Sequence, residues 1–231
     1  AENPDVFFQH RESSNKYYDA VPGIVEDYMG EISKITGREY HLFNYYGDPE
    51  ADRIIIAMGS VTQCAEEAID YLRKKGEKVG MVNVHLYRPF SAEHFLKVIP
   101  KTVKRIAVLD RTKEPGANGE PLYLDVVEVF KDVKDAPFIV SGRYGLSSKD
   151  TTPVQIMSVF ENLALPLPKN YFTIGIVDDV TFRSLPMKEE IAIDDEGLFE
   201  GKFYGLGADG TVGANKNTIK IIGENTDKYC Q

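Results

Sequence analysis

Apolar residues repeat along this chain in two alternating patterns, short continuous runs and longer stretches with a helical period. The first periodic stretch lies between Val21 and Ile35, where apolar residues recur at steps of three and four. Pro22 fits only the first turn of a helix, so the predicted helix begins near it, and Gly37 is placed to end it. The run RIIIAM at 53–58 is continuous instead, which is typical of a strand covered on both faces.

The same alternation continues to about residue 177. Further strands are predicted at 79–84, 106–109, 138–140 and 172–177. Between them lie amphipathic helices, which begin after Ser60 (ending at Gly76), at Ser91, at Pro121 and at Thr152, with capping-box spacing in Ser60–Gln63 and Thr152–Gln155. Strand, loop and helix repeated in this way predict an α/β fold, a mostly parallel sheet with helices on both faces and right-handed crossovers.

Composition changes after about residue 185, and we expect a domain boundary there. Residues 1–185 are predicted to form the α/β domain. Residues 186–231 are predicted to hold a linker and the beginning of another domain, because an acidic stretch precedes a strand–loop–helix pattern. That pattern consists of a strand at 201–204, a glycine-rich loop and a helix from about Val212.

The acidic stretch is interpreted as a solvated linker, with a short strand at 190–192. Its carboxylates are Asp194, Asp195 and Glu196. They lack the alternating spacing of a calcium loop and have no histidine nearby, which argues against a metal site.

The loop GLGADGTVGANK (205–216) contains a G-x-G-x-x-G motif, and in a strand–loop–helix context this motif can hold an anion at a helix N-terminus. It departs from the phosphate-cradling G-x-x-x-x-G-K-[ST] pattern, because Thr211 and Val212 stand where Lys and Ser or Thr are required. A dinucleotide site also needs a second strand carrying an acidic residue about twenty residues further on, and no such strand follows the loop. Two interpretations stay open: a structural turn, or a cofactor-contacting loop of a domain of which this is only the start.

Charge and cysteine content narrow the classes of function. The net charge is −9, from 27 basic and 36 acidic residues, which disfavours nucleic acid and anionic membranes as partners. Two cysteines, Cys64 and Cys230, are too few for a disulfide framework or a cysteine-ligated iron–sulfur cluster. The sequence has no apolar run of membrane-spanning length and no signal-peptide pattern at Ala1–Pro4, so we expect a cytoplasmic protein. The absence of an initial Met suggests a piece of a longer chain.

Most other reactive side chains are predicted to have structural roles. Cys64 lies on the apolar face of its helix, and His85 follows a strand beside Arg88, so we expect a core thiol and a structural hydrogen bond. Arg143 and Lys149 flank YGLSS beyond the carboxyl end of a strand, where contact with a neighbouring domain is expected. The other histidines form no cluster with cysteine or paired acids, which argues against a metal site: His10, His41 and His94.

Several long stretches resemble pyruvate:ferredoxin (flavodoxin) oxidoreductase. They are YYDAVPGIVEDYM (17–29), ITGREYHLFNYYGDPEADRIIIAMGS (35–60), VNVHLYRPF (82–90), AVLDRTKEPGANGEPLYLDV (107–126), SGRYGLSSKDTTP (141–153), GIVDDVTFRSLP (175–186) and FYGLGADGTVGANK (203–216). The resemblance covers essentially the whole chain. It implies that residues 1–185 are the family's second domain, which is related in fold to the C-terminal domain of transketolase. Residues 186–231 would then begin the third domain, which handles coenzyme A.

The resemblance also implies what the whole enzyme does. That enzyme oxidatively decarboxylates pyruvate on thiamine diphosphate and magnesium, passes electrons through [4Fe-4S] clusters to ferredoxin or flavodoxin, and releases acetyl-coenzyme A. It is implied to be a homodimer. The family's thiamine site lies between its first and sixth domains, so for these 231 residues we expect no bound cofactor, no catalytic residue and no turnover.

Their expected role is therefore structural, as a part that docks with the remaining domains of the same large enzyme. The alternative is a free-standing α/β protein that binds coenzyme A or a nucleotide.

The one ligand role that the resemblance implies lies in the glycine-rich loop. The candidate residues for the coenzyme A region are Gly207, Asp209, Gly210, Thr211, Asn215 and Lys216. Backbone N–H groups and Lys216 could face phosphate, while Asn215 could hydrogen-bond the pantetheine arm. Asp209 would repel an anion, and the alternative for this residue is a side chain that braces the loop by bonding its backbone.

Overall fold

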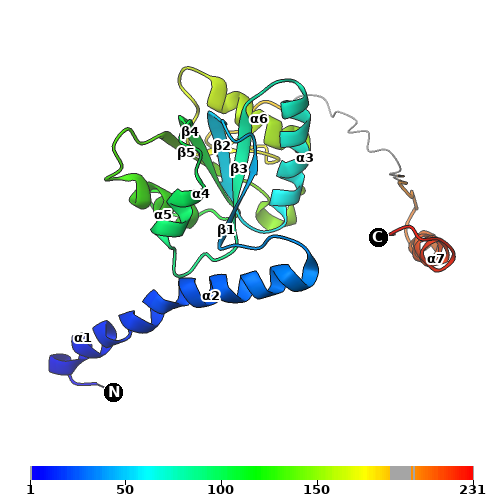
Figure 1. Ribbon diagram of the computed structural model, residues 1–231. Coiled ribbons are helices and arrows are strands. Elements are labelled where there is room, and N and C mark those ends of the chain that lie inside the picture. The colour runs from blue at the N-terminus through cyan, green and yellow to red at the C-terminus, as the bar shows by residue number, and fades with distance from the viewer. Residues whose placement is uncertain (1, 188–198, 200, 231) are drawn as a thin grey trace. The chain divides into compact units, whose positions relative to one another are not determined.

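Six strands form one sheet in the part of the chain that the computed structural model describes, residues 2–187, 199 and 201–230 (Figure 1). Their order across the sheet is β1-β3-β2-β4-β5-β6, and all neighbouring pairs are parallel except β1 with β3. The strands are β1 Phe43–Gly47, β2 Arg53–Ala57, β3 Val79–Val84, β4 Arg105–Asp110, β5 Phe138–Arg143 and β6 Phe172–Thr173. The predicted mostly parallel sheet is confirmed, although the sequence pattern does not predict the antiparallel edge strand β1.

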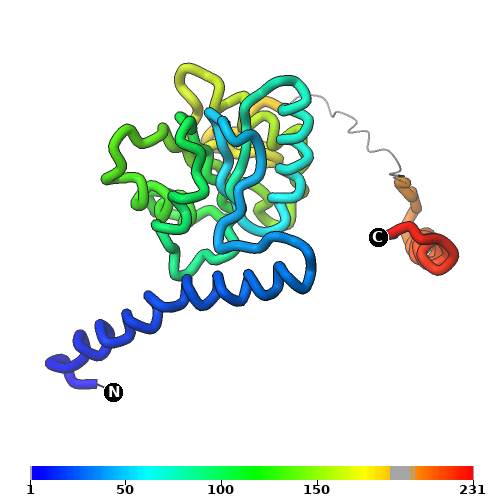
Figure 2. The backbone as a smooth tube through the Cα atoms, in the orientation of Figure 1, coloured from blue at the N-terminus to red at the C-terminus, as the bar shows by residue number. Residues whose placement is uncertain are grey.

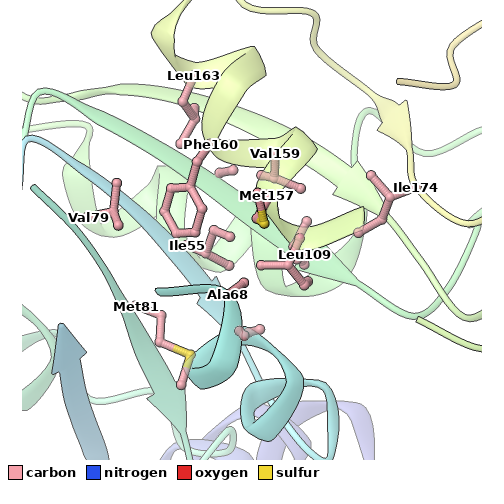
Figure 3. Close-up of a cluster of buried hydrophobic side chains, with 14 of the residues drawn as sticks. Ile55, Ala68, Val79, Met81, Leu109, Met157, Val159, Phe160, Leu163 and Ile174 are labelled. Carbon is pink, nitrogen blue, oxygen red and sulfur yellow. The ribbon is translucent and has the colours of Figure 1, made fainter. Parts of the chain in front are cut away.

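Helices cover both faces of this sheet, as predicted. On one face α3 (Val61–Lys74) and α6 (Pro153–Ala164) pack against every second strand residue, such as Ile55 in β2 (Figure 3). On the other face α4 (Ala92–Val98) and α5 (Pro121–Phe130) pack against the alternate positions, such as Ile56. Both side-chain sets of β2 are buried, which is why its sequence is a continuous apolar run rather than an alternating one.

The N-terminal helices differ from the sequence prediction. Helix α1 (Pro4–Ser13) is not predicted at all, and α2 spans Asn15–Thr36 with Pro22 inside it rather than in its first turn. Figure 2 shows α1 and α2 following one another, with α1 leading away from the sheet. An interior proline leaves the carbonyl four residues earlier unpaired, here that of Tyr18. Because Tyr18 is exposed, water can take the place of the missing donor.

Two other local predictions are wrong for reasons of backbone geometry. Ser60 has helical dihedral angles and makes no side-chain capping bond, whereas a capping serine needs extended ones. Strand β6 ends at Thr173 instead of 177, because Gly175 takes a left-handed conformation (φ 65°) that turns the chain. The capping box predicted for Thr152 and Gln155 is confirmed, with the Thr152 N–H donating to Gln155 at 3.3 Å.

Two arginines join the amino ends of β2 and β4 to the end of α6. The Arg53 guanidinium donates to the carbonyl of Phe160 at 3.3 Å and pairs with Glu77 at 2.8 Å. Arg105 donates to the carbonyls of Leu163 and Leu165. These carbonyls lie in the last turn of α6 and at its C-cap Leu165, and cations are favourable at this end of a helix.

The chain divides into two units, Ala1–Ile191 and Ala192–Gln231, which we describe separately. The second contains α7 (Thr211–Asn225), the helix predicted after the glycine-rich loop. The strand predicted at 201–204 is wrong, since these residues have no ladder partner among the described residues and are exposed. The predicted strand at 190–192 and the carboxylates at 194–196 lie outside the described residues, and the boundary after residue 185 stays a prediction.

The remaining regular element is a short 3-10 helix, Leu146–Ser148. None of the helices in the described ranges combines the length and the apolar character needed to cross a membrane.

Candidate functional site

The glycine-rich loop is organised around its own aspartate. One carboxylate oxygen of Asp209 accepts the N–H of Leu206 at 2.7 Å, and the other accepts the N–H and the hydroxyl of Thr211 at 3.0 and 2.7 Å. Gly210 takes the left-handed conformation (φ 87°) that lets α7 begin directly after it. A Cβ on Gly205 would lie 2.6 Å from the Thr211 hydroxyl, so the close approach requires glycine there.

These contacts give the loop an internal anion at the start of α7. Hydrogen bonds from the Thr211 hydroxyl, and then from backbone N–H groups, lower the pKa of Asp209 from 3.8 to about 2. The carboxylate is therefore charged at neutral pH and occupies the N–H groups of Leu206 and Thr211, two of the donors that a phosphate bound at this helix end could use. The loop-bracing interpretation of Asp209 agrees with this geometry.

The six predicted coenzyme A residues are only partly brought together. Gly207, Asp209, Gly210 and Thr211 share the braced loop, in which the Asp209 N–H also donates to the Gly207 carbonyl at 2.8 Å. Asn215 and Lys216 lie one turn further along α7. Neither side chain makes a hydrogen bond or ion pair that joins it to another described residue, and Lys216 is exposed. Their proposed ligand role stays a prediction.

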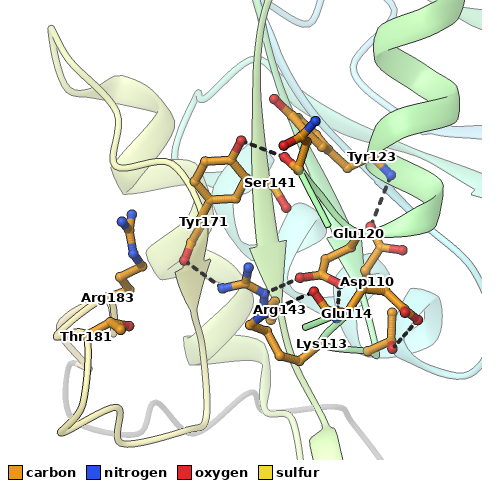
Figure 4. Close-up of polar contacts among 12 residues, drawn as sticks. Asp110, Lys113, Glu114, Glu120, Tyr123, Ser141, Arg143, Tyr171, Thr181 and Arg183 are labelled. Carbon is orange, nitrogen blue, oxygen red and sulfur yellow. Dashed lines mark hydrogen bonds and ion pairs between the residues drawn. The ribbon is translucent and has the colours of Figure 1, made fainter. Parts of the chain in front are cut away.

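A second polar group lies at the carboxyl ends of β4 and β5 in the first unit. Asp110, the last residue of β4, is buried and accepts the N–H groups of Leu122 and Tyr123 at 2.9 and 3.1 Å (Figure 4). It thereby satisfies the first turn of α5, which begins at Pro121 and has no side-chain cap of its own. Burial raises the pKa of Asp110, and the two N–H bonds only partly oppose this effect.

The same edge holds a buried ion pair between Glu120 and Arg143. The Arg143 Nε donates to a Glu120 oxygen at 2.6 Å, and these side chains are 12% and 1% exposed respectively. Glu120 also accepts the N–H of Glu114 at 2.8 Å, and Arg143 donates to the Tyr171 carbonyl at 3.3 Å. The pair therefore joins the loop before α5 to the residues before β6. An aspartate at a strand end followed by a Gly-Glu-Pro turn is the sequence signal that points to this arrangement.

The structure corrects one expectation for this edge. Arg143 was expected to contact a neighbouring domain, but its guanidinium faces Glu120 inside the domain. Lys149 is exposed, so its predicted role stays open. The structural role of His85 is confirmed, because its Nδ1 lies 2.8 Å from the His41 carbonyl. The Cys64 thiol lies 3.3 Å from the Thr151 carbonyl, and burial raises its pKa to about 12, which fits a core thiol.

The chemistry of these side chains does not fit an iron–sulfur cluster. The two cysteines fall in different units, whereas a [4Fe-4S] cluster takes four thiolates. Among the described residues no group of three or more His, Cys, Asp or Glu side chains could hold a metal ion. The polar groups that the structure does bring together bond to the backbone and to one another, which is typical of side chains that stabilise a fold.

The sheet order, with helices on both faces and polar groups at its carboxyl edge, defines a doubly wound α/β domain. The sequence model of one family, pyruvate:ferredoxin oxidoreductase core domain II, matches residues 51–156. The chain is 60% identical over 232 residues to the pyruvate-flavodoxin oxidoreductase of Enterobacter agglomerans, and 58% identical over 231 residues to the pyruvate:ferredoxin oxidoreductase of Moorella thermoacetica. The chain therefore belongs to the pyruvate:ferredoxin (flavodoxin) oxidoreductase family.

The match covers all of this chain but only 20% of each of those two proteins. Among solved structures, 2-oxoglutarate:ferredoxin oxidoreductase from Magnetococcus marinus aligns with 55% of this chain and 20% of its own, at 19% identity and a TM-score of 0.39. Transketolase structures align at lower TM-scores.

The buried ion pair generates a stability prediction. We expect Arg143→Leu to lower the free energy of unfolding by about 3–5 kcal/mol, because it leaves the Glu120 carboxylate buried without its partner. The measurement is urea unfolding followed by circular dichroism. Lys149→Leu, at an exposed cation, is the control and should change stability by less than about 0.5 kcal/mol. The double variant Glu120→Leu/Arg143→Leu should be more stable than Arg143→Leu, and a still less stable double variant would contradict the assignment.

The braced loop generates a prediction about pH. Thr211→Val should raise the pKa of Asp209 from about 2 towards its ordinary value of 3.8, because it removes the largest stabilising hydrogen bond. Since the pKa is lowered in the folded chain, the bracing is fully present above the ordinary value and is lost as pH falls towards 2. The carboxyl carbon shift of Asp209, followed by NMR against pH, measures this directly. Thr218→Val, which removes a hydroxyl bonded to Ala214 in the same helix, should leave it unchanged.

Proposed function

We propose that these residues are a non-catalytic docking part of a pyruvate:ferredoxin (flavodoxin) oxidoreductase, an enzyme that converts pyruvate and coenzyme A to acetyl-coenzyme A and CO2. One observation carries the proposal. Helix α2 has an apolar face that the first unit does not cover.

This face, the α2 stripe, consists of Tyr17, Ile24, Tyr28, Ile32 and Ile35, all of them exposed. They recur at steps of seven, four, four and three residues, so they share one side of the helix. The neighbouring side of α2, with Val25 and Met29, packs partly against the sheet core. A helix with apolar residues on a second, uncovered side is typical of a segment that packs between two bodies.

The length of the relatives supports a partner within the same polypeptide. The chain matches 20% of the pyruvate-flavodoxin oxidoreductase of Enterobacter agglomerans, so about four-fifths of that protein lies outside the matched segment. A surface joined covalently to its partner gains a high effective concentration, and therefore needs little affinity of its own. In this proposal the α2 stripe is covered by that remaining chain.

The proposal assigns residues 1–185 to the family's transketolase C-terminal-like second domain and residues 186–231 to a linker and the start of its third domain. Coenzyme A would meet the second segment along the loop at Gly207, Asp209, Gly210 and Thr211, and at Asn215 and Lys216. Lys216 would supply the positive charge, because Asp209 already takes the N–H groups of Leu206 and Thr211. Thiamine diphosphate, magnesium and the [4Fe-4S] clusters would be bound by other parts of the enzyme. We further propose that the whole enzyme is a cytoplasmic homodimer that reduces ferredoxin or flavodoxin.

The test compares the isolated 231-residue chain with a long family polypeptide that carries it in place. Only the long polypeptide should reduce ferredoxin with pyruvate and coenzyme A. In it, Tyr28→Ser and Ile32→Ser should each lower the free energy of unfolding by about 1.5–3 kcal/mol, since each removes a buried apolar side chain. In the isolated chain the same changes should cost less than about 0.5 kcal/mol.

Lys34→Ser, an exposed polar position on α2 outside the stripe, is the matched control and should have little effect in either form. Equal effects of Tyr28→Ser in both forms would mean that nothing covers the stripe and would contradict the docking proposal.

The coenzyme A assignment has its own test in the long polypeptide. Lys216→Met should raise the KM for coenzyme A about tenfold with kcat unchanged, because one charge-assisted bond to phosphate is lost without a change in the chemical step. Lys220→Met, on the same helix but near Glu224 at 3.8 Å, should leave KM unchanged. An unchanged KM for Lys216→Met would remove this residue from the coenzyme A site.

A further inference from the structure

The loop of residues 177–183, here called the Asp178 loop, is held by one carboxylate. Asp178 accepts hydrogen bonds from the N–H groups of Val180, Thr181 and Arg183 at 3.1, 2.8 and 2.9 Å, and from the Thr181 hydroxyl at 2.6 Å. These bonds, the Thr181 hydroxyl first, lower the pKa of Asp178. The carboxylate is therefore charged across the neutral range and fixes the backbone of the loop.

The base of the Asp178 loop is attached to the sheet. The Ser184 hydroxyl accepts the Asp178 N–H and donates to the Ile176 carbonyl, both at 2.8 Å. The Leu185 N–H donates to Thr173 of β6 at 2.9 Å. Figure 4 shows Arg183 beside Tyr171, whose ring centre lies 5.7 Å from the guanidinium carbon. Hydrogen bonds thus hold the loop at both ends.

The Asp178 loop presents three large apolar side chains to solvent. Val177, Val180 and Phe182 are 80%, 81% and 75% exposed. Phe182 also has a positive φ of 55°, a conformation that is strained for a bulky residue. Since strained residues persist only where surrounding contacts fix them, and cluster at ligand clamps and switches, the loop has the character of a recognition element rather than a free connection.

We propose that the Asp178 loop inserts Val177, Val180 and Phe182 into an apolar pocket on the remaining chain of the same oxidoreductase. This inference rests on the proposed docking function and adds a second, independent contact point to the α2 stripe. A fixed backbone carrying exposed apolar side chains fits a concave apolar partner, because little conformational entropy is lost when the side chains are buried.

The charge near the Asp178 loop favours an apolar protein pocket over a phosphate-bearing partner. The loop carries two acids, Asp178 and Asp179, against one cation, Arg183, and the chain as a whole carries −9. Both features repel nucleic acid and anionic lipid headgroups. The curated relatives match this chain over its full length and continue well beyond that segment, so most of a long family polypeptide is available to supply the pocket.

Hydroxyl-radical footprinting with mass spectrometry tests the inference, since it reports side-chain exposure at named residues. Oxidation of Phe182 in the long polypeptide should be about fivefold lower than in the isolated 231-residue chain, because the centre of an interface is fully desolvated. Leu167, 81% exposed in the same unit but outside the loop, is the comparison residue and should react equally in both forms.

Phe182→Gly separates packing from folding, because glycine accepts the positive φ without strain. The variant should shift the urea midpoint of the long polypeptide downward and leave that of the isolated chain unchanged, whereas Leu167→Ser should shift neither.

Equal oxidation of Phe182 in both forms would overturn the inference. If Tyr28 of the α2 stripe were protected in that experiment, the docking function would stand without this contact. If neither residue were protected, both proposals would fail. Protection of Phe182 that depends on the concentration of the isolated chain would identify a second copy as the occupant and would also overturn the inference.

Discussion

A parallel sheet that is covered by helices on both faces leaves almost no position along its strands for a polar side chain. Alternate residues of β2, such as Ile55 and Ile56, enter different cores, and both are fully buried. Polar groups are therefore displaced to the strand ends, where loops and helix termini offer partners. The carboxyl edge holds Asp110, Glu120 and Arg143, and the amino edge holds arginines bonded to α6. The charged side chains at both edges of the sheet therefore follow from the architecture and need no functional explanation.

This constraint explains which features the sequence predicts well. The continuous apolar runs of β2, β3 and β4 and the helical stripes of α3, α5 and α6 follow from two-sided burial, and the structure confirms them. Features that depend on single backbone angles are missed, such as the turn at Gly175 that ends β6. The sequence does not predict β1 because this edge strand pairs with β3 on one side only. Most of its residues are half-buried, so they do not form a continuous apolar run. The position of Pro22 is mispredicted because its helix is exposed, so that water can replace the donor that proline lacks.

The candidate site is less predictable for a related reason. A glycine motif indicates a tight turn before a helix, and the turn is present at residues 205–210. The motif does not indicate which group accepts hydrogen bonds from the N–H groups of the turn, because a side chain of the loop can do so in place of a ligand. Here Asp209 does so. Arg143 is the opposite case. A cation at a strand end suggests a partner outside the domain, but the structure shows that Arg143 pairs with the buried Glu120. In both cases the deciding partner is a nearby acid whose direction the sequence does not specify.

The arginine contacts at the amino edge have a consequence for the order in which the domain assembles. Arg53 and Arg105 belong to strands in the first half of the chain, but they bond to carbonyls at the end of α6, 107 and 58 residues later. During synthesis β2 and β4 emerge long before these acceptors exist. Until α6 docks, the face of the sheet on which it packs would be covered by α3 alone, and the two guanidinium groups would be hydrated. Closing contacts of such long sequence separation is slow, so docking of α6 would be a late step in folding. A chain interrupted before α6 would expose the part of this apolar face that α3 does not cover.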